Sequence, residues 1–142
     1  MILKKIHYGS EDHKNMIQLR NDILRKPLGL VFSESELEKE KDDILIGAFK
    51  NGNIQACCVL SKISEDTIKL RQMAVQTEWQ GKGIGSAVLD FAESLARQNG
   101  YKKVYLHARE TATEFYKAAD YQIQGNSFLE VSIPHYAMEK IL

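Results

Sequence analysis

The sequence has no excess of either charge, because 19 Lys and Arg residues balance 19 Asp and Glu residues among its 142 positions. Proteins that bind nucleic acids over a broad surface carry a marked positive excess. We therefore expect no nucleic-acid partner, and we expect any phosphate binding to depend on a local arrangement of residues.

Long apolar segments are also missing. No run approaches the roughly 18 consecutive apolar residues of a membrane span, and the first residues, MILKKIHYGSEDHK, lack the continuous apolar core of a signal peptide. We expect no membrane partner and a cytoplasmic location. Since 44% of the residues are hydrophobic, a chain of this length can bury one core, which predicts a single domain over residues 1–142.

Cysteine is scarce, and the only two, Cys57 and Cys58, are adjacent. In the strand predicted there, their side chains point to opposite faces, and a disulfide between neighbours would be strained. The sequence contains no Cys-x-x-Cys or His-x-x-x-His spacing of the kind that is typical of metal sites. We expect two unreactive thiols and no bound metal.

The spacing of apolar residues predicts the secondary structure of the first half of the chain. Asn51-Gly52 marks a hairpin turn between two strands, and Ser33-x-x-Glu36 matches a capping box at the start of a helix. The predicted elements are a strand over 2–8, a helix over 11–25, a helix from residue 33, and antiparallel strands over 42–50, 54–63 and 67–75.

The pattern changes after Val75, where a short loop leads to the sequence QGKGIG at residues 80–85 and then to an apolar helical face that ends at Gly100. A strand follows over 103–107. Strand, glycine loop, helix and strand therefore form one right-handed βαβ crossover with two parallel strands. A helix over 111–119 and strands over 121–131 and 135–141 complete the predicted elements.

The glycines of QGKGIG lie where a βαβ unit binds anions. The loop leads to a helix whose first N–H groups are unpaired and carry a partial positive charge. Glycine lets the backbone approach a phosphate closely, and Lys82 adds charge. The alternative is that these glycines only permit a tight turn. The dinucleotide fingerprint Gly-x-Gly-x-x-Gly and the P-loop Gly-x-x-x-x-Gly-Lys-Ser/Thr are both absent, which disfavours a nucleotide-binding protein.

Two motifs resemble those of the GCN5-related N-acetyltransferase (GNAT) superfamily. Gln80, Gly83 and Gly85 form the Gln-x-x-Gly-x-Gly pattern of its acyl-CoA loop, and residues 128–138 are similar to the Phe-x-Glu-x-x-Ile-Pro-His-x-x-Met signature of ElaA-like members. The order of predicted elements is similar over most of the chain. The resemblance implies a GNAT fold of the α/β (α+β) class, with a mixed sheet of about six to seven strands flanked by about four helices.

The resemblance also implies an enzyme that transfers the acetyl group of acetyl-CoA to a primary amine of a small molecule or peptide, by direct attack in a ternary complex. Arg109 departs from the family, where asparagine is common, and Asp120 stands where glycine is common. The residues that the resemblance places against acetyl-CoA are Met73, Ala74, Val75, Gln80, Gly81, Lys82, Gly83, Ile84, Gly85, Ser86, Arg109, Phe115 and Tyr116.

Acetyl transfer needs a base, because an alkylammonium with a pKa of about 10.4 must lose a proton before it attacks. Glu130 is the first candidate, ahead of His135 and His107, and an enclosed cleft would raise the pKa of this carboxyl. Tyr116 is the candidate acid for the departing thiolate, by family position. The alternatives are a packed tyrosine, a solvated strand carboxylate, and histidines that satisfy backbone groups.

Arg71 and Gln72 adjoin the point where the two parallel strands would part, and alternation places them on opposite faces. We predict that Arg71, Gln72 and His107 contact the acceptor, with pairing of Arg71 to a strand neighbour as the alternative. Two other hypotheses for the chain are an acetyl-CoA-binding sensor or scaffold without turnover, and a nucleotide-phosphate-binding α/β protein. By analogy with the family, a homodimer that pairs its closing strands is a further expectation.

Overall fold

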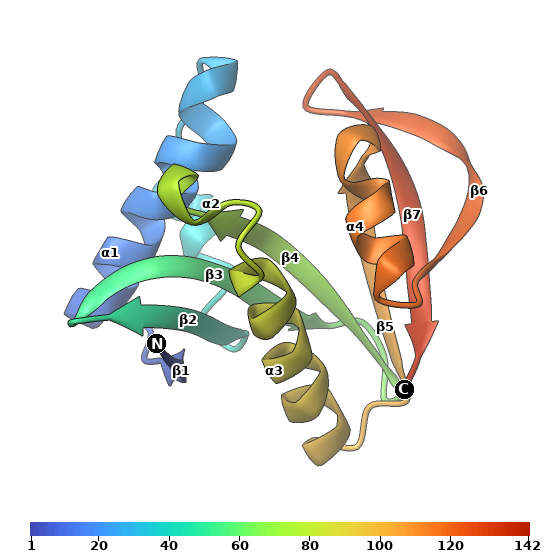
Figure 1. The fold of residues 1–142 in the computed structure, drawn as a ribbon, viewed down its shortest axis with the longest axis horizontal. Helices are drawn as coiled ribbons and strands as arrows, with labels where there is room; N and C mark the ends of the chain where they lie inside the picture. Colours follow the sequence, from blue (N-terminus) through green and yellow to red (C-terminus); the bar gives the residue numbers. More distant parts are fainter.

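One seven-stranded sheet organises the computed structural model, which describes residues 1–142. The strand order is β1-β2-β3-β4-β5-β7-β6, and only β4 and β5 run parallel. This mixed sheet with a single βαβ crossover confirms the predicted α/β (α+β) class (Figure 1). The strands are β1 (Ile2–Ile6), β2 (Ile44–Lys50), β3 (Asn53–Lys62), β4 (Thr67–Val75), β5 (Lys103–Arg109), β6 (Gln122–Glu130) and β7 (Ile133–Ile141).

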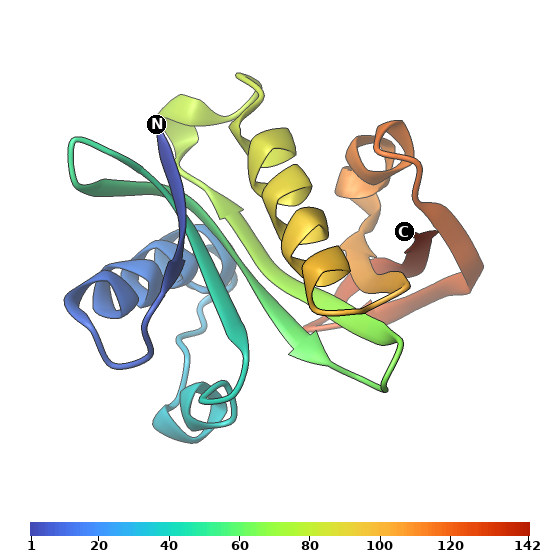
Figure 2. The same cartoon turned by 90° about the horizontal axis from the view of Figure 1, so that it is seen from below.

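Four α-helices accompany the sheet: α1 (Glu11–Arg20), α2 (Glu34–Glu38), α3 (Ile84–Gln98) and α4 (Thr113–Ala118). Helices α1 and α3 cover opposite faces of the β3–β4 region, as Figure 2 shows. Each face has its own apolar cluster, and the two neighbouring cysteines belong to different ones: Cys57 packs with residues of α1 and Cys58 with residues of α3. Burial raises the pKa of the Cys57 thiol to about 12 despite the charge of Arg20, so this thiol is unreactive at neutral pH.

The first helix ends earlier than apolar spacing predicts. After Arg20 the chain continues as one π-helical turn over Asn21–Arg25, then as a 3-10 turn over Lys26–Leu28 that ends at Gly29 with φ of 72°. Lys26 keeps α-helical backbone angles, so the break follows from Pro27 itself, which has no N–H to continue the helical hydrogen bonds. The wider π turn places Leu24 and Arg25 beside the main cleft.

The parallel ladder between β4 and β5 is short. Paired residues run from Thr67↔Lys103 to Leu70↔Leu106, and the strands part beyond them. The partner strand β3 shifts register against β4 between Cys57 and Val59, and Gln72 at this irregularity has φ of 57°. Strict alternation does not continue through this bulge, because Arg71 pairs with Val59 and Ala74 with Cys57, which places these two residues, three positions apart, on one face.

A buried carboxylate joins the two halves of the fold. The half that carries β1–β4 includes α3, and the half that carries β5–β7 includes α4 (Figure 1). Glu93 of α3 accepts a 2.8 Å hydrogen bond from the Tyr121 hydroxyl and a 2.9 Å bond from the Lys140 ammonium of β7. These bonds fix the distance between the halves on the α3 face of the sheet.

A second buried ion pair holds α1 to the segment before β2. The Arg20 guanidinium donates two 2.8 Å hydrogen bonds to the two oxygens of Glu40, and their side chains are 0% and 2% exposed. The Phe32 ring lies 4.5 Å from the Arg20 guanidinium and 4.1 Å from that of Arg25. The acidic partner and the aromatic ring together keep this arginine in the protein interior.

Replacing Glu40 with glutamine should cost about 3–5 kcal/mol of unfolding free energy, because it leaves a buried guanidinium without its counter-charge. Urea denaturation measures this loss. Glu65→Gln is the matched control: the Glu65 side chain is 95% exposed where it pairs with Lys62, and its loss should leave the denaturation midpoint nearly unchanged. Equal losses in both variants would contradict a special role for the Arg20–Glu40 pair.

Candidate functional site

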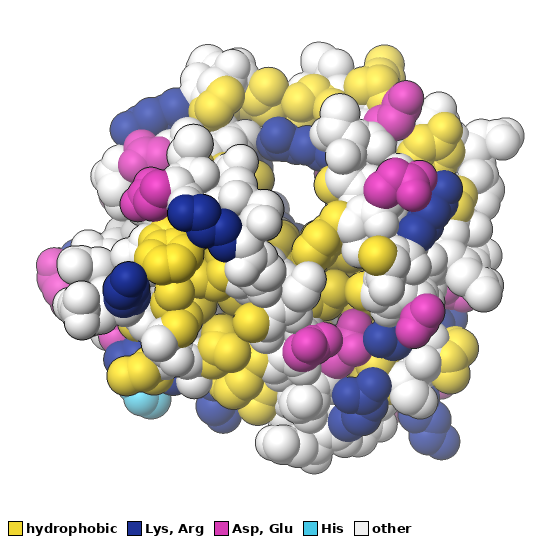
Figure 3. All heavy atoms as spheres, in the orientation of Figure 1, with side chains coloured by type: hydrophobic (Ala, Val, Ile, Leu, Met, Phe, Trp, Pro, Cys, Tyr) yellow, Lys and Arg dark blue, Asp and Glu magenta, His cyan; other side chains and the backbone are white.

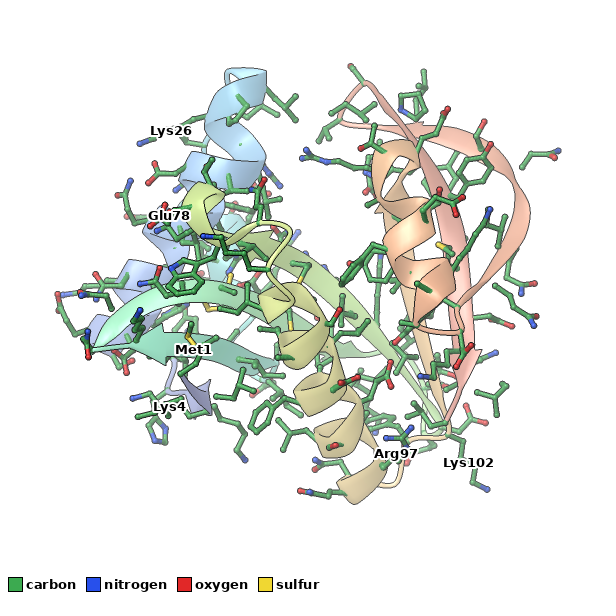
Figure 4. All side chains as sticks on the ribbon, viewed as in Figure 1. Met1, Lys4, Lys26, Glu78, Arg97 and Lys102 are labelled. Atoms are coloured by element: carbon green, nitrogen blue, oxygen red, sulfur yellow. The ribbon has the colours of Figure 1, made fainter.

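A cleft of about 740 Å³ opens where β4 and β5 part. Figure 3 shows the hollow between the two halves of the molecule, with Lys and Arg side chains on its upper rim, and Figure 4 shows side chains from both halves that point into it. The predicted residues that line the cleft are Arg71, Gln72, Met73, Val75, Gln80, Gly81, Gly83, Gly85, Ser86, His107, Arg109, Phe115, Tyr116, Glu130 and His135.

Three predicted cofactor residues lie outside the cleft lining. Ala74 is buried in the α1-side cluster, and Ile84 is buried in the α3-side cluster. Lys82 is exposed, with its ammonium 5.6 Å from the centre of the Trp79 ring. Ala74 pairs with Cys57 on the α1 side of the sheet, and Ile84 lies on the inward face of α3, so both side chains are used for packing.

The glycine loop forms the end of the cleft nearest α3. Gly81 and Gly83 have φ of 75° and 86°, and Gly83 is the N-cap of α3 without any side-chain capping bond. The first N–H groups of the helix are thus available to a ligand. The Gln80 side chain closes the loop by donating a 3.0 Å hydrogen bond to the Val75 carbonyl. A Cβ at Gly83 would meet no protein atom within 4 Å, so its backbone angle, and not crowding, calls for glycine.

Gly85 has a different role from the other two glycines. A Cβ built there would come within 3.4 Å of the Phe115 ring, which belongs to α4. A Cβ at this distance would make ordinary van der Waals contact, so neither crowding nor the backbone angle calls for glycine at position 85. Only Gly81 and Gly83 of this motif have the positive φ that favours glycine.

Tyr116 reaches the cleft from α4 but is almost completely enclosed. It is 6% exposed, and its ring makes edge contacts with Phe115 at 4.9 Å and Tyr121 at 5.7 Å. Burial, with a contribution from Cys58, raises the pKa of the Tyr116 phenol well above its usual value. The phenol therefore keeps its proton at neutral pH and remains a hydrogen-bond donor.

The opposite wall of the cleft carries a polar cluster built from three strands. His107 of β5 shares a 3.0 Å hydrogen bond with Glu130 of β6 through Nδ1, and a 2.9 Å bond with the Tyr105 hydroxyl through Nε2. His135 of β7 uses Nδ1 to contact the Ile133 carbonyl at 2.7 Å, and its Nε2 lies 3.5 Å from Glu130. The Phe128 ring packs against both histidine rings.

The pKa of Glu130 differs from the prediction. Burial alone would raise it, but the His107 hydrogen bond and the charges of His107, His135 and Lys69 together hold the pKa of Glu130 below its ordinary value. The sequence-based expectation of a raised pKa is therefore wrong, because it did not include the two histidines. Glu130 is a carboxylate at neutral pH, and its side chain is 45% exposed to the cleft.

Arginine side chains connect the cleft to the rest of the fold. Arg71 contacts Asp43 at 3.8 Å and Glu40 at 4.0 Å, and it donates a 3.3 Å hydrogen bond to Ser61 on the neighbouring strand. Arg109 donates a 3.1 Å hydrogen bond to the carbonyl of Leu24. Arg109 thus bridges from the end of β5 to the π turn that follows α1.

Sequence reasoning missed several lining residues: Leu24, Arg25, Lys69, Leu70, Leu106, Ala108, Ala112 and Val131. Of these, Lys69 had a usable signal, because strand alternation places it on the same face as Arg71. No sequence signal indicated Leu24 and Arg25, since their position depends on the π turn. No helix is long and apolar enough to cross a membrane, and no group of three or more His, Cys, Asp or Glu side chains is arranged to hold a metal ion.

Comparison with known proteins identifies the class that this fold and cleft define. The acetyltransferase (GNAT) family model matches residues 12–121, which is more than half of the chain. This protein therefore belongs to the GNAT acetyltransferase family. The Bacillus subtilis (strain 168) protein YyaT is 29% identical over 80 residues, which covers 56% of this chain and 54% of YyaT. The match thus spans about half the length of that relative.

Solved structures share the fold at lower identity. Escherichia coli ElaA superposes with a TM-score of 0.83 at 17% identity, covering 98% of both chains. An aminoglycoside 6'-N-acetyltransferase in complex with coenzyme A superposes with a TM-score of 0.83 at 15% identity, covering 99% of this chain and 97% of that one. Both confirm the GNAT fold that the sequence motifs predicted.

If the glycine loop binds coenzyme A, a bulky residue at position 83 should weaken that binding while the fold persists. Gly83→Val introduces strain of about 1–2 kcal/mol through its left-handed backbone and fills space beside the free N–H groups of α3. Gly52→Val is the matched control, because Gly52 also has a positive φ, 80°, with no atom within 4 Å of a Cβ, and it lies in the β2–β3 turn. Isothermal titration with coenzyme A should show a Kd at least about tenfold higher for Gly83→Val only. Equal affinities in the two variants would contradict the loop assignment.

Proposed function

We propose that this protein is an acetyl-CoA-dependent N-acetyltransferase that acts on a primary amine of a small molecule or peptide by direct attack in a ternary complex. One observation carries the proposal: a single cleft joins the free N–H groups of the glycine loop to the polar cluster around Glu130, through the gap between β4 and β5. Membership of the GNAT family and the coenzyme A complex of a structural neighbour support the same cosubstrate.

The residues fit the chemical parts of acetyl-CoA. The N–H groups at the start of α3 suit its pyrophosphate, since a helix amino terminus stabilises negative charge. Beyond Leu70, the edge of β4 that faces β5 has no strand partner. These backbone groups are available to the amides of the pantetheine arm and, near Met73, to the oxyanion that forms during acyl transfer.

Glu130 is suited to receive the proton that the acceptor ammonium must lose. Its lowered pKa makes it a weak base by itself. We therefore propose that Glu130 takes up the proton first and passes it to solvent through His107 and Tyr105. The neutral amine nitrogen then forms a bond to the acetyl carbon and releases its second proton along the same path, and the carbon–sulfur bond breaks. Tyr116 donates a proton to the departing sulfur and is reprotonated from solvent.

The test of this proposal is titration with acetyl-CoA, with NADH and ATP as controls, followed by thiol release with a panel of amines. Selective acetyl-CoA binding with amine-dependent thiol release is the expected result. Binding without release from any amine would instead indicate a sensor or scaffold. Absence of acetyl-CoA binding would overturn the assignment of the cleft.

Tyr116→Phe should lower kcat by about 100-fold or more, because a positioned general acid contributes about 10²–10⁴ to the rate, while the Kd for acetyl-CoA stays within about twofold. Tyr121→Phe is the control, since that hydroxyl serves the Glu93 network outside the cleft. It should lower the melting temperature but leave kcat unchanged. If Tyr116→Phe keeps the wild-type kcat, Tyr116 is not the general acid.

Glu130→Gln should reduce kcat/KM for the amine by about 100-fold without changing acetyl-CoA affinity. Its effect on stability depends on pH. The folded-state pKa of Glu130 lies below the ordinary value of 4.5, so wild type is more stable than the variant above that pH and loses the advantage as pH falls through the folded pKa. Thermal melts between neutral pH and pH 3 measure this. A constant difference down to acid pH would contradict the His107–Glu130 interaction.

A further inference from the structure

The charges that line the cleft are unbalanced, although the whole chain is neutral. Arg25, Lys69, Arg71 and Arg109 line it, whereas Glu130 is its only acidic lining residue. Three of the four cations have partners within the protein. Arg25 pairs with Glu36 at 3.1 Å, Arg71 contacts Asp43, and Arg109 bonds to a carbonyl.

Lys69 is the exception, because its ammonium has no ion pair within 4.0 Å and no hydrogen bond. The residue is half-buried in the middle of β4. Burial lowers the pKa of Lys69, against the opposing influence of Glu130. A partly desolvated cation without a partner is costly, and an anionic ligand would remove that cost.

Lys69 lies away from the glycine loop and next to the polar cluster. It pairs in register with Tyr105 on β5 and Ser61 on β3, so it shares their face of the sheet. Leu70 packs in the α3-side cluster, which places Lys69 on the other face. The N–H groups of α3 and the Lys69 ammonium therefore lie in different parts of the cleft.

From this geometry we propose that the acceptor carries a carboxylate as well as its amine, and that Lys69 binds this carboxylate while Glu130 faces the ammonium. The inference rests on the proposed acetyltransferase function and adds the class of acceptor. Amino acids and amino-acid-like compounds have both groups, whereas alkylamines and polyamines lack the anion. A singly charged group is favoured over a phosphate because Lys69 is the one unpaired cation and Glu130 stands nearby.

The first test compares amines of similar size that differ in their anion. The wild-type enzyme is assayed for thiol release with γ-aminobutyrate, n-butylamine and O-phosphoethanolamine, and with α-amino acids beside their amides. We expect kcat/KM to be at least about tenfold higher for the carboxylates than for their counterparts without an anion. Equal or better turnover of the amines that lack an anion would overturn the inference and leave the acetyltransferase function intact. A preference for the phosphate compound would overturn the carboxylate class.

The second test removes the charge of Lys69. Lys69→Met should raise KM for the carboxylate acceptors about tenfold, with the acetyl-CoA Kd unchanged and KM for n-butylamine raised by less than about threefold. Lys103→Met is the matched control, because Lys103, the first residue of β5, pairs with Glu139 of β7 and does not line the cleft. Lys69→Gln serves as a second variant if Lys69→Met melts early. An unchanged KM in a folded Lys69 variant would overturn the assignment.

Binding of the same carboxylates to the protein saturated with coenzyme A provides a readout without turnover. Saturable binding of an amino carboxylate that Lys69→Met weakens about tenfold supports the inference even where no thiol is released, and in that case the acetyltransferase function alone fails. Absence of saturable binding for every amino carboxylate, together with absence of turnover, would overturn both.

Discussion

The early end of the β4–β5 ladder is the constraint on which the site depends. After Leu70 the two strands part, so each keeps one edge of backbone N–H and C=O groups without a strand partner. Pairing on the outer sides continues as far as Val75 against β3 and Arg109 against β7. The gap is therefore held open between two anchored strands, and ligand atoms entering it meet fixed backbone groups. Such preorganisation lets hydrogen bonds act without reordering the protein.

Burial and charge separate the protonation states of the two groups to which we assign the chemistry. Tyr116 is enclosed by aromatic rings, which keeps the phenol neutral, whereas Glu130 stands between two histidines and stays ionised. Opposite environments for two titratable groups in one cleft are typical of a division between acid and base roles. The Glu93 network lies outside the cleft and contributes to stability: its bonds to Tyr121 and Lys140 join the half that carries Tyr116 to α3, and the Lys140 bond remains when Tyr121 loses its hydroxyl.

Local sequence signals predicted most of the elements and the place of the glycine loop between β4 and α3, because apolar period, Asn51-Gly52 and the capping box at Ser33 act over a few residues. Three features of the site depend on long-range geometry and had no such signal. The bulge at Gln72 arises from the register of β4 against β3. The π turn before Lys26-Pro27 contributes to the site through the hydrogen bond that Arg109, far away in the sequence, donates to Leu24. The contact of His107 with Glu130 requires β6 to curve over β7, which sequence spacing does not reveal.

Ion pairs beside β4 determine which cations of the cleft have a partner within the protein. Glu40 neutralises the buried Arg20 and also lies 4.0 Å from Arg71, while Asp43 lies 3.8 Å from Arg71. Two carboxylates thus serve two guanidinium groups, and Lys69 beside them is left without a partner. Because the pairs are formed by buried or half-buried groups, solvent ions screen them weakly. The fold therefore leaves one cation without an ion pair within 4.0 Å on the side of the cleft where we place the acceptor, with the charge of Glu130 as its opposing influence, and this arrangement suits one carboxylate better than a polyanion or a second cation.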